Sequence, residues 1–214
     1  MLLSFIISIV GLLFLFVNSL LFLKTRKGKD GNYQCLTFYL TILFIVELAC
    51  HIIGISEINS NFFLSHYYFI IQFIALSLFF YQIFDNKKLK NFIFFNLIVV
   101  GFILAYQYYN NPKLYWEFNV LEIGLTSSLL VVYCIIHFYR HLKSSFDYFY
   151  FCFGLTFYLT SSMLIFLSGN TTLVFFEEPF YCDIWVFNSL FYILYQYLIF
   201  KEWKYLNKKI EVLE

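Results

Sequence analysis

The chain has 214 residues, of which 62% are hydrophobic and 13% are charged, and its formal net charge is +1. About a quarter of the residues in an ordinary soluble domain are charged, so this composition excludes a typical soluble fold. The nearly neutral charge gives no reason to expect a nucleic-acid partner.

Stretches of about 20 apolar residues predict transmembrane helices. The sequence has seven, at about 2–23, 36–56, 62–84, 91–108, 119–139, 148–168 and 183–200. The first follows no basic residue, is longer than a signal-peptide core and precedes no small-x-small cleavage site, so we interpret it as a retained helix. We therefore predict an all-α membrane protein, with residues 1–200 forming one seven-transmembrane-helix bundle.

The basic residues predict the orientation of this bundle. All 14 except Lys113 follow odd-numbered spans, in four groups: Lys24, Arg26, Lys27 and Lys29; Lys87, Lys88 and Lys90; Arg140 and Lys143; and Lys201, Lys204, Lys208 and Lys209. The positive-inside rule then places the N-terminus outside and the C-terminus in the cytoplasm. The outer loops, 110–117 and 171–183, contain both prolines, Pro112 and Pro179.

The last stretch, 201–214, reads KEWKYLNKKIEVLE. We expect it to prolong the last helix as a short amphipathic tail on the cytoplasmic surface. Such a tail is too short for a catalytic or DNA-binding domain, so signalling would need a partner protein.

Polar residues line one side of each predicted span, which predicts a polar interior. Polar contacts between membrane helices usually stabilise packing by only about 0.6 kcal/mol each. A carboxylate such as Glu47 costs roughly 2.5 kcal/mol or more at the membrane centre and is a functional candidate by default. With the predicted orientation, Glu47 and Gln72 lie near the midplane of the membrane. His51, Tyr68, Glu122 and Asn188 lie in its outer half. The hypothesis is a ligand- or proton-responsive pocket open to the outer side, formed by Glu47, His51, Tyr68, Gln72, Glu122 and Asn188.

Familiar reaction chemistry is mostly missing from the sequence. Span 183–200 has no lysine for a retinal Schiff base, and GxSxG and phosphate-loop motifs are absent. His137 and His141 have a metal-compatible i, i+4 spacing. The neighbouring basic loop favours an ordinary helix end for these two histidines. The outer set of His51, His66, Glu47 and Glu122 is chemically able to bind a divalent ion, and the sequence leaves its geometry open. We predict no catalytic residue, no metal, no cofactor and no disulfide among the five cysteines.

Several segments resemble a family of small seven-helix membrane proteins of Bacteroidota type that is generally uncharacterised. They are FIVEL (Phe44–Leu48) with the polar turn at Asn59, the stretch Tyr68–Lys90, FNVLE (Phe118–Glu122) and Phe187–Trp203. In such relatives the polar position of the third helix is often acidic, whereas here it is Gln72, which disfavours a carboxylate pair with Glu47. Their genes are reminiscent of neighbours of sensor histidine kinases. The resemblance thus implies an accessory sensory role in the bacterial inner (cytoplasmic) membrane.

Three functions remain open from the sequence. The first is a non-enzymatic sensory or accessory subunit that works with a protein partner in the lipid bilayer. The second is a small-solute or proton-coupled transporter, which the proline-free helices disfavour because midplane transport sites often use broken helices. The third is a membrane-embedded enzyme that acts on lipid through the outer His and Glu side chains.

Overall fold

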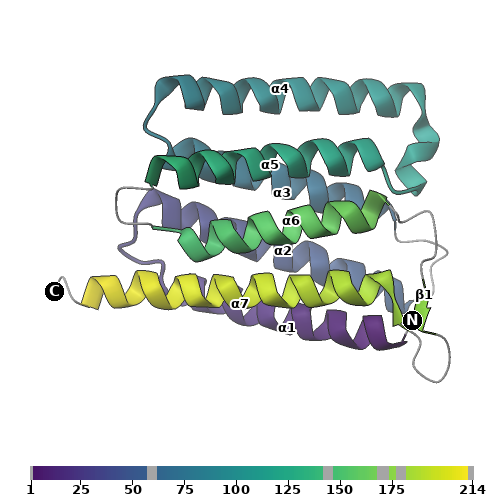
Figure 1. Ribbon diagram of the computed structural model, residues 1–214, viewed down its shortest axis with the longest axis horizontal. Helices are drawn as coiled ribbons and strands as arrows, with labels where there is room; N and C mark the ends of the chain where they lie inside the picture. The colour runs from purple at the N-terminus through teal and green to yellow at the C-terminus, as the bar shows by residue number, and fades with distance from the viewer. Residues whose placement is uncertain (1, 57–61, 142–146, 168–173, 177–181, 212–214) are drawn as a thin grey trace. The chain divides into compact units, whose positions relative to one another are not determined.

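The computed structural model describes residues 2–56, 62–141, 147–167, 174–176 and 182–211. Asn59, Lys143, Pro179 and most of the predicted outer loop 171–183 lie outside these residues. Within them are seven α-helices, one 3-10 helix and two short strands (Figure 1). Their bounds are α1 Leu2–Thr25, α2 Gly31–Ile55, α3 Phe63–Ile83, α4 Lys87–Asn110, η1 Pro112–Trp116, α5 Val120–His141, α6 Phe149–Leu167, β1 Val174–Phe176, β2 Cys182–Asp183 and α7 Ile184–Glu211.

Six of these helices, α1 to α6, are long and apolar enough to cross a membrane. They confirm the prediction of a helical, multi-pass membrane protein. The predicted seventh span, 183–200, coincides with the first part of α7, which is not among the six. Its apolar run contains Asn188 and Gln196 and ends at Lys201, which lowers its hydropathy. The strands β1 and β2, which pair antiparallel, were not predicted.

Capping residues set the beginnings of two helices. The side chain of Asp30 accepts a hydrogen bond from the Tyr33 amide at 3.2 Å, so α2 begins at Gly31, five residues before the predicted apolar span. Asn86 accepts one from the Lys88 amide at 2.8 Å, so α4 begins at Lys87. The turn before α2 contains Gly28, whose φ of +77° favours glycine.

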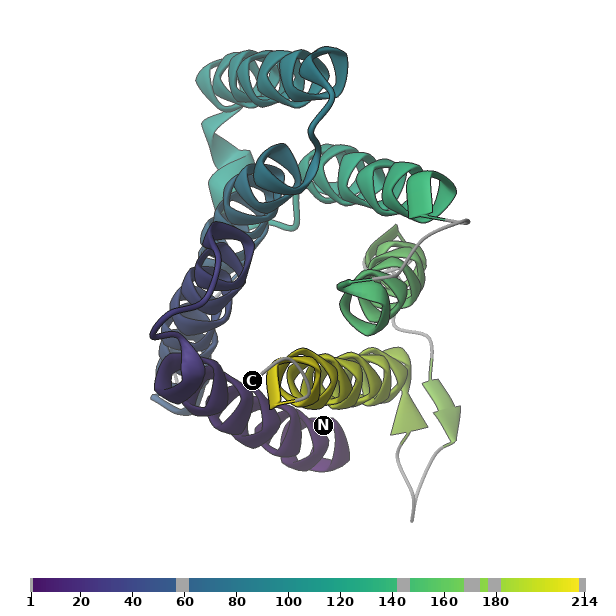
Figure 2. The same cartoon turned by 90° about the vertical axis from the view of Figure 1, so that its left-hand side faces the viewer.

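The chain divides into two compact units, residues 25–130 and residues 1–24 with 131–214. In the unit 25–130, α2 and α3 pack side by side (Figure 2). Leu36, Leu40 and Leu43 form the fully buried face of α2 at the i, i+4, i+7 spacing of a helix stripe. Helix α4 packs against α3, and η1 contacts both.

The other unit contains α1, α6, α7 and the second half of α5, and α7 contacts α1 and α6 closely. A Cβ on Gly11 of α1 would lie 2.8 Å from the ring of Tyr192, and one on Gly154 of α6 would lie 3.0 Å from that of Tyr195. Helices α6 and α7 lie side by side and antiparallel in Figures 1 and 2. The small residues thus allow close helix packing, as is usual in membrane proteins.

Candidate functional site

Among the described residues of the unit 25–130, the most buried acidic group is Glu122, in the first turn of α5, with 0% of its surface exposed. Asn119 caps this helix: its Oδ1 accepts a hydrogen bond from the Glu122 amide at 3.2 Å, and its carbonyl accepts one from the Ile123 amide at 3.0 Å. In an ordinary capping box the glutamate would turn back to the amide of the capping residue. Here the carboxylate oxygens of Glu122 instead contact His66 and Tyr108.

These three side chains form a cluster that joins α3, α4 and α5. Nδ1 of His66 lies 3.2 Å from Oε1 of Glu122 and 2.8 Å from the hydroxyl of Tyr108. The Tyr108 hydroxyl donates to Oε2 of Glu122. Nε2 of His66 lies 3.2 Å from the backbone carbonyl of Tyr115. His66 is only 4% exposed, so His66 and Glu122 are both removed from solvent.

The contacts of this cluster restrict where its protons can lie. A carbonyl only accepts, so Nε2 of His66 carries a hydrogen and donates to Tyr115. Tyr108 donates its single hydroxyl hydrogen to Glu122. It therefore has no second hydrogen to donate to Nδ1 of His66. A hydrogen bond between Nδ1 and Oε1 would need one further proton, on either His66 or Glu122. The pair is then an imidazolium beside a carboxylate, or a neutral imidazole beside a carboxylic acid, and its net charge is zero in both.

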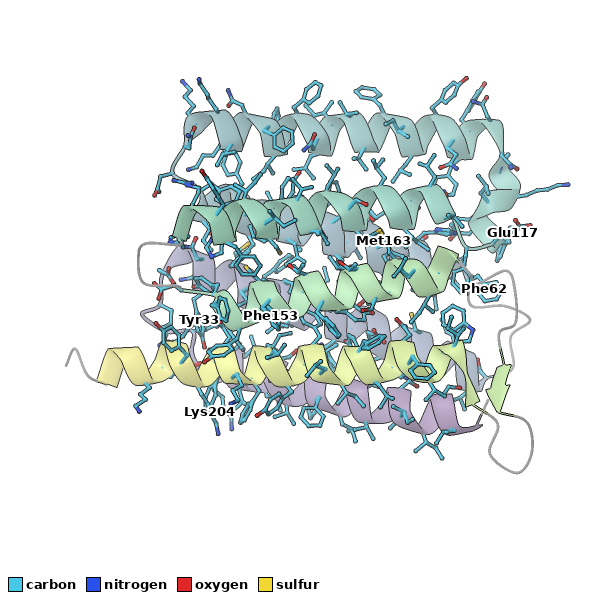
Figure 3. All side chains as sticks on the ribbon, viewed as in Figure 1. Tyr33, Phe62, Glu117, Phe153, Met163 and Lys204 are labelled. Atoms are coloured by element: carbon cyan, nitrogen blue, oxygen red, sulfur yellow. The ribbon has the colours of Figure 1, made fainter. Side chains whose placement is uncertain are left out.

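The segment η1 covers the His66 side of this cluster. The ring of Tyr115 stacks on that of His66 at a centroid distance of 5.8 Å, and its hydroxyl lies 3.0 Å from that of Tyr67. The Tyr67 hydrogen bond is the main cause that raises the pKa of Tyr115. Figure 3 labels Phe62, before α3, and Glu117, after η1, at the same end of the unit. This end also holds an amide pair in which Gln107 and Asn119 each donate to the other, at 3.2 and 3.0 Å.

Two of the predicted site residues, Glu47 and His51, lie one turn apart on α2 and are partly exposed. Nδ1 of His51 is 2.8 Å from the backbone carbonyl of Glu47 and 3.8 Å from its Oε2. The spacing that singled them out in the sequence thus produces a local contact. Glu47 continues the stripe of Leu36, Leu40 and Leu43, beyond its fully buried part.

The predicted proximity of Gln72 and Glu47 does not follow from the packing of α2 and α3. Gln72 is buried, and its Nε2 donates to the hydroxyl of Tyr39 at 3.1 Å. Tyr39 precedes Glu47 by two helical turns, or roughly 12 Å along the axis. Tyr68 is buried one turn before Gln72, with its ring 5.2 Å from that of Phe69. These contacts are explained by helix packing.

Asn188 is partly buried on α7, in the other compact unit. Its Oδ1 is a buried acceptor without a hydrogen-bond partner among the described residues. Among the predicted site residues, Glu122 is the one that the structure places in a buried ionisable cluster.

Sequence reasoning missed Tyr108 and assigned His66 only to a weak metal alternative. Two signals were available: the Asn-x-x-Glu pattern at 119–122, and Gln107 and Tyr108 near the end of a span. The described residues contain no group of three or more His, Cys, Asp and Glu side chains that could hold a metal ion.

Comparisons with models of protein families, with curated proteins and with solved structures gave no match to this chain. The resemblance to small seven-helix proteins of Bacteroidota type therefore stays a prediction, and functional inference depends on the cluster itself.

Proposed function

We propose that this protein is a non-enzymatic, proton-responsive membrane subunit. The observation that supports this proposal is the His66–Tyr108–Glu122 cluster, in which Nδ1 of His66 and Oε1 of Glu122 are close enough to share a proton. Ionisable residues within membrane helices are functional candidates by default, and they usually pair with one another.

Loss of the shared proton would give the cluster a net negative charge. The lone pair of Nδ1 of His66 would then face a carboxylate oxygen of Glu122 across 3.2 Å. Two acceptors at that separation repel each other, and a buried charge without a counter-ion is strongly unfavourable. We infer that deprotonation separates the first turns of α3 and α5 and moves η1, which is tied to His66 through Tyr115.

This proposal includes a topology and a partner. The charge pattern predicts seven spans, including α7, with η1 on the outer side of a bacterial inner membrane and the C-terminus in the cytoplasm. Because α5 is one continuous helix of 22 residues, a shift at Glu122 would be carried along it. A sensory or accessory role further requires a membrane protein partner that responds to this shift, as the family resemblance implies.

Tryptophan fluorescence tests the proton response directly. Trp116 ends η1 and contacts Phe63 at 5.8 Å, so a variant with Trp185→Phe and Trp203→Phe reports on this segment. In lipid nanodiscs, we expect its emission to change sigmoidally with pH. The change should be lost in Glu122→Gln and His66→Gln and kept in Glu47→Gln. An identical titration in Glu122→Gln and the parent would refute the proposal.

A proton-coupled transporter is the second candidate, because buried Glu and His pairs also form proton relays in membrane proteins. It predicts proton flux into liposomes loaded with a pH-sensitive dye, and loss of that flux in Glu122→Gln. Fluorescence changes without flux would favour the sensory role.

A further inference from the structure

Glu202 is a second fully buried carboxylate, in the unit formed by residues 1–24 and 131–214. It lies on α7 beyond the predicted span, with 0% of its surface exposed. Its Oε1 accepts a hydrogen bond from the Tyr148 amide at 3.0 Å, and its Oε2 accepts one from the Phe151 amide at 3.2 Å. Helix α6 begins at Phe149. Glu202 therefore caps α6 from another helix and satisfies two amides at the helix start.

The turn that Glu202 holds has an unfavourable backbone conformation. Tyr148 has a φ of +65°, which is a genuine outlier for a bulky residue, and its side chain is buried. Such conformations persist only where the surroundings hold them. The hydrogen bond from the Tyr148 amide to Glu202 is one contact that holds Tyr148 in this conformation.

The groups that act on the charge of Glu202 come from the start of α6 and from the two residues before it. Asp147 and the thiol of Cys152 interact with it electrostatically. Cys152 in turn contacts Cys134 of α5, and Nε2 of His137 lies 3.1 Å from the Asp147 carbonyl. The amides of Tyr148, Tyr150 and Phe151 favour the carboxylate. Asp147 has the opposite effect, because its negative charge disfavours a second negative charge on Glu202.

Burial outweighs these amides and raises the pKa of Glu202 from 4.5 to about 7. A raised pKa means that the folded protein binds this proton more tightly than the unfolded chain does. The stabilisation is fully present at pH values below about 4.5 and is lost as the pH rises through about 7. The carboxyl therefore changes its charge near neutral pH.

We propose that Glu202 and the N-terminus of α6 form a proton-sensitive latch, which loosens the α6–α7 junction when the carboxyl loses its proton. This latch is separate from the His66–Tyr108–Glu122 cluster and does not depend on the proposed function. By the charge pattern it would lie on the cytoplasmic side, where it would respond to cytoplasmic pH.

Cys152 is a suitable reporter of this junction, because it is fully buried one turn after Tyr148. The experiment uses the full chain in nanodiscs, with Cys35, Cys50, Cys134 and Cys182 replaced by alanine. Short maleimide pulses between pH 5.5 and 8.5 are quantified by mass spectrometry. Each rate is divided by that of the unfolded chain at the same pH, which removes the intrinsic pH dependence of thiol reactivity.

We expect the normalised labelling of Cys152 to rise at least fivefold through pH 7. In Glu202→Gln, which keeps an oxygen acceptor but carries no charge, it should stay flat. The rise should persist in Glu122→Gln, which separates the latch from the proposed sensor, and in His137→Gln. A normalised rate that is constant with pH in the Glu202 protein, or an equal rise in Glu202→Gln, would overturn the proposal. The test on the protein that keeps Glu202 remains decisive even if Glu202→Gln does not fold.

Discussion

Nδ1 of His66 and Oε1 of Glu122 lie 3.2 Å apart, although 56 residues separate them in the sequence. Both side chains are buried, and Glu122 reaches His66 at the expense of the capping interaction that its position in α5 would allow. The Glu122 carboxylate therefore links α3 to α5 and does not cap its own helix. Under the proposed function, a proton shared in this contact would make the link dependent on pH.

Glu122→Ala should be much more destabilising than Glu122→Gln. Alanine leaves the buried His66 and the Tyr108 hydroxyl without their acceptor, and breaking a buried pair costs about 3–5 kcal/mol. Glutamine keeps an oxygen and a donor in place, so its cost should be about 1–2 kcal/mol. Thermal unfolding in detergent measures both. The partly exposed Glu47→Ala is the control, and an equal loss there would contradict the special role of Glu122.

Tyr108→Phe isolates the hydroxyl that contacts both other members of the cluster. Its removal should destabilise the protein by about 1–3 kcal/mol, because an oxygen of Glu122 then lacks a donor. It should also shift the midpoint of the Trp116 fluorescence titration. Tyr106→Phe, on the exposed side of α4, should change neither quantity. An unshifted titration in Tyr108→Phe would show that the hydroxyl plays no part in the proton response.

Gly11→Ala tests the close packing of α1 on α7. The added Cβ would lie 2.8 Å from a ring carbon of Tyr192, and such overpacking typically costs about 1–3 kcal/mol. Gly101→Ala meets nothing within 4 Å. Since alanine favours helix over glycine by about 1 kcal/mol, that control should be neutral or stabilising. Equal melting temperatures for the two variants would contradict this packing.

The predicted topology is tested by cysteine labelling in a cysteine-free background. Lys113 and Lys204 are both exposed, and the positive-inside rule places them on opposite sides of the membrane. In intact spheroplasts, an impermeant maleimide should label Lys113→Cys, whereas Lys204→Cys should react only after lysis. Labelling of both sites in intact cells would show that α7 does not cross the membrane.

The helices were predictable because long apolar runs are unbroken and Pro112 lies between two of them. The early starts of α2 and α4 were missed because hydropathy ignores the polar first turns that Asp30 and Asn86 cap. These two residues are standard helix-start signals, so the sequence did contain the information. Span 183–200 is harder to identify as transmembrane, because Asn188 and Gln196 lower its mean hydropathy.

The site was predictable only in part. Glu122 was identified because a carboxylate is conspicuous in an apolar span, but its partners depend on how α3 and α4 rotate against α5. Tyr108 is one of 19 tyrosines, and its position near the end of a span is only a weak signal. The pairing of Gln72 with Tyr39 instead of Glu47 likewise depends on the register of α2 against α3, which single-helix periodicity does not encode.

The shared proton is tested most directly by nitrogen-15 NMR of histidine-labelled protein in lipid, with the His66 signals assigned from His66→Gln. The account predicts that Nε2 of His66 carries a hydrogen. It also predicts that the Nδ1 signal is that of a protonated or strongly hydrogen-bonded nitrogen and changes in Glu122→Gln. A neutral tautomer with a bare Nε2, or an Nδ1 signal that Glu122→Gln leaves unchanged, would contradict it.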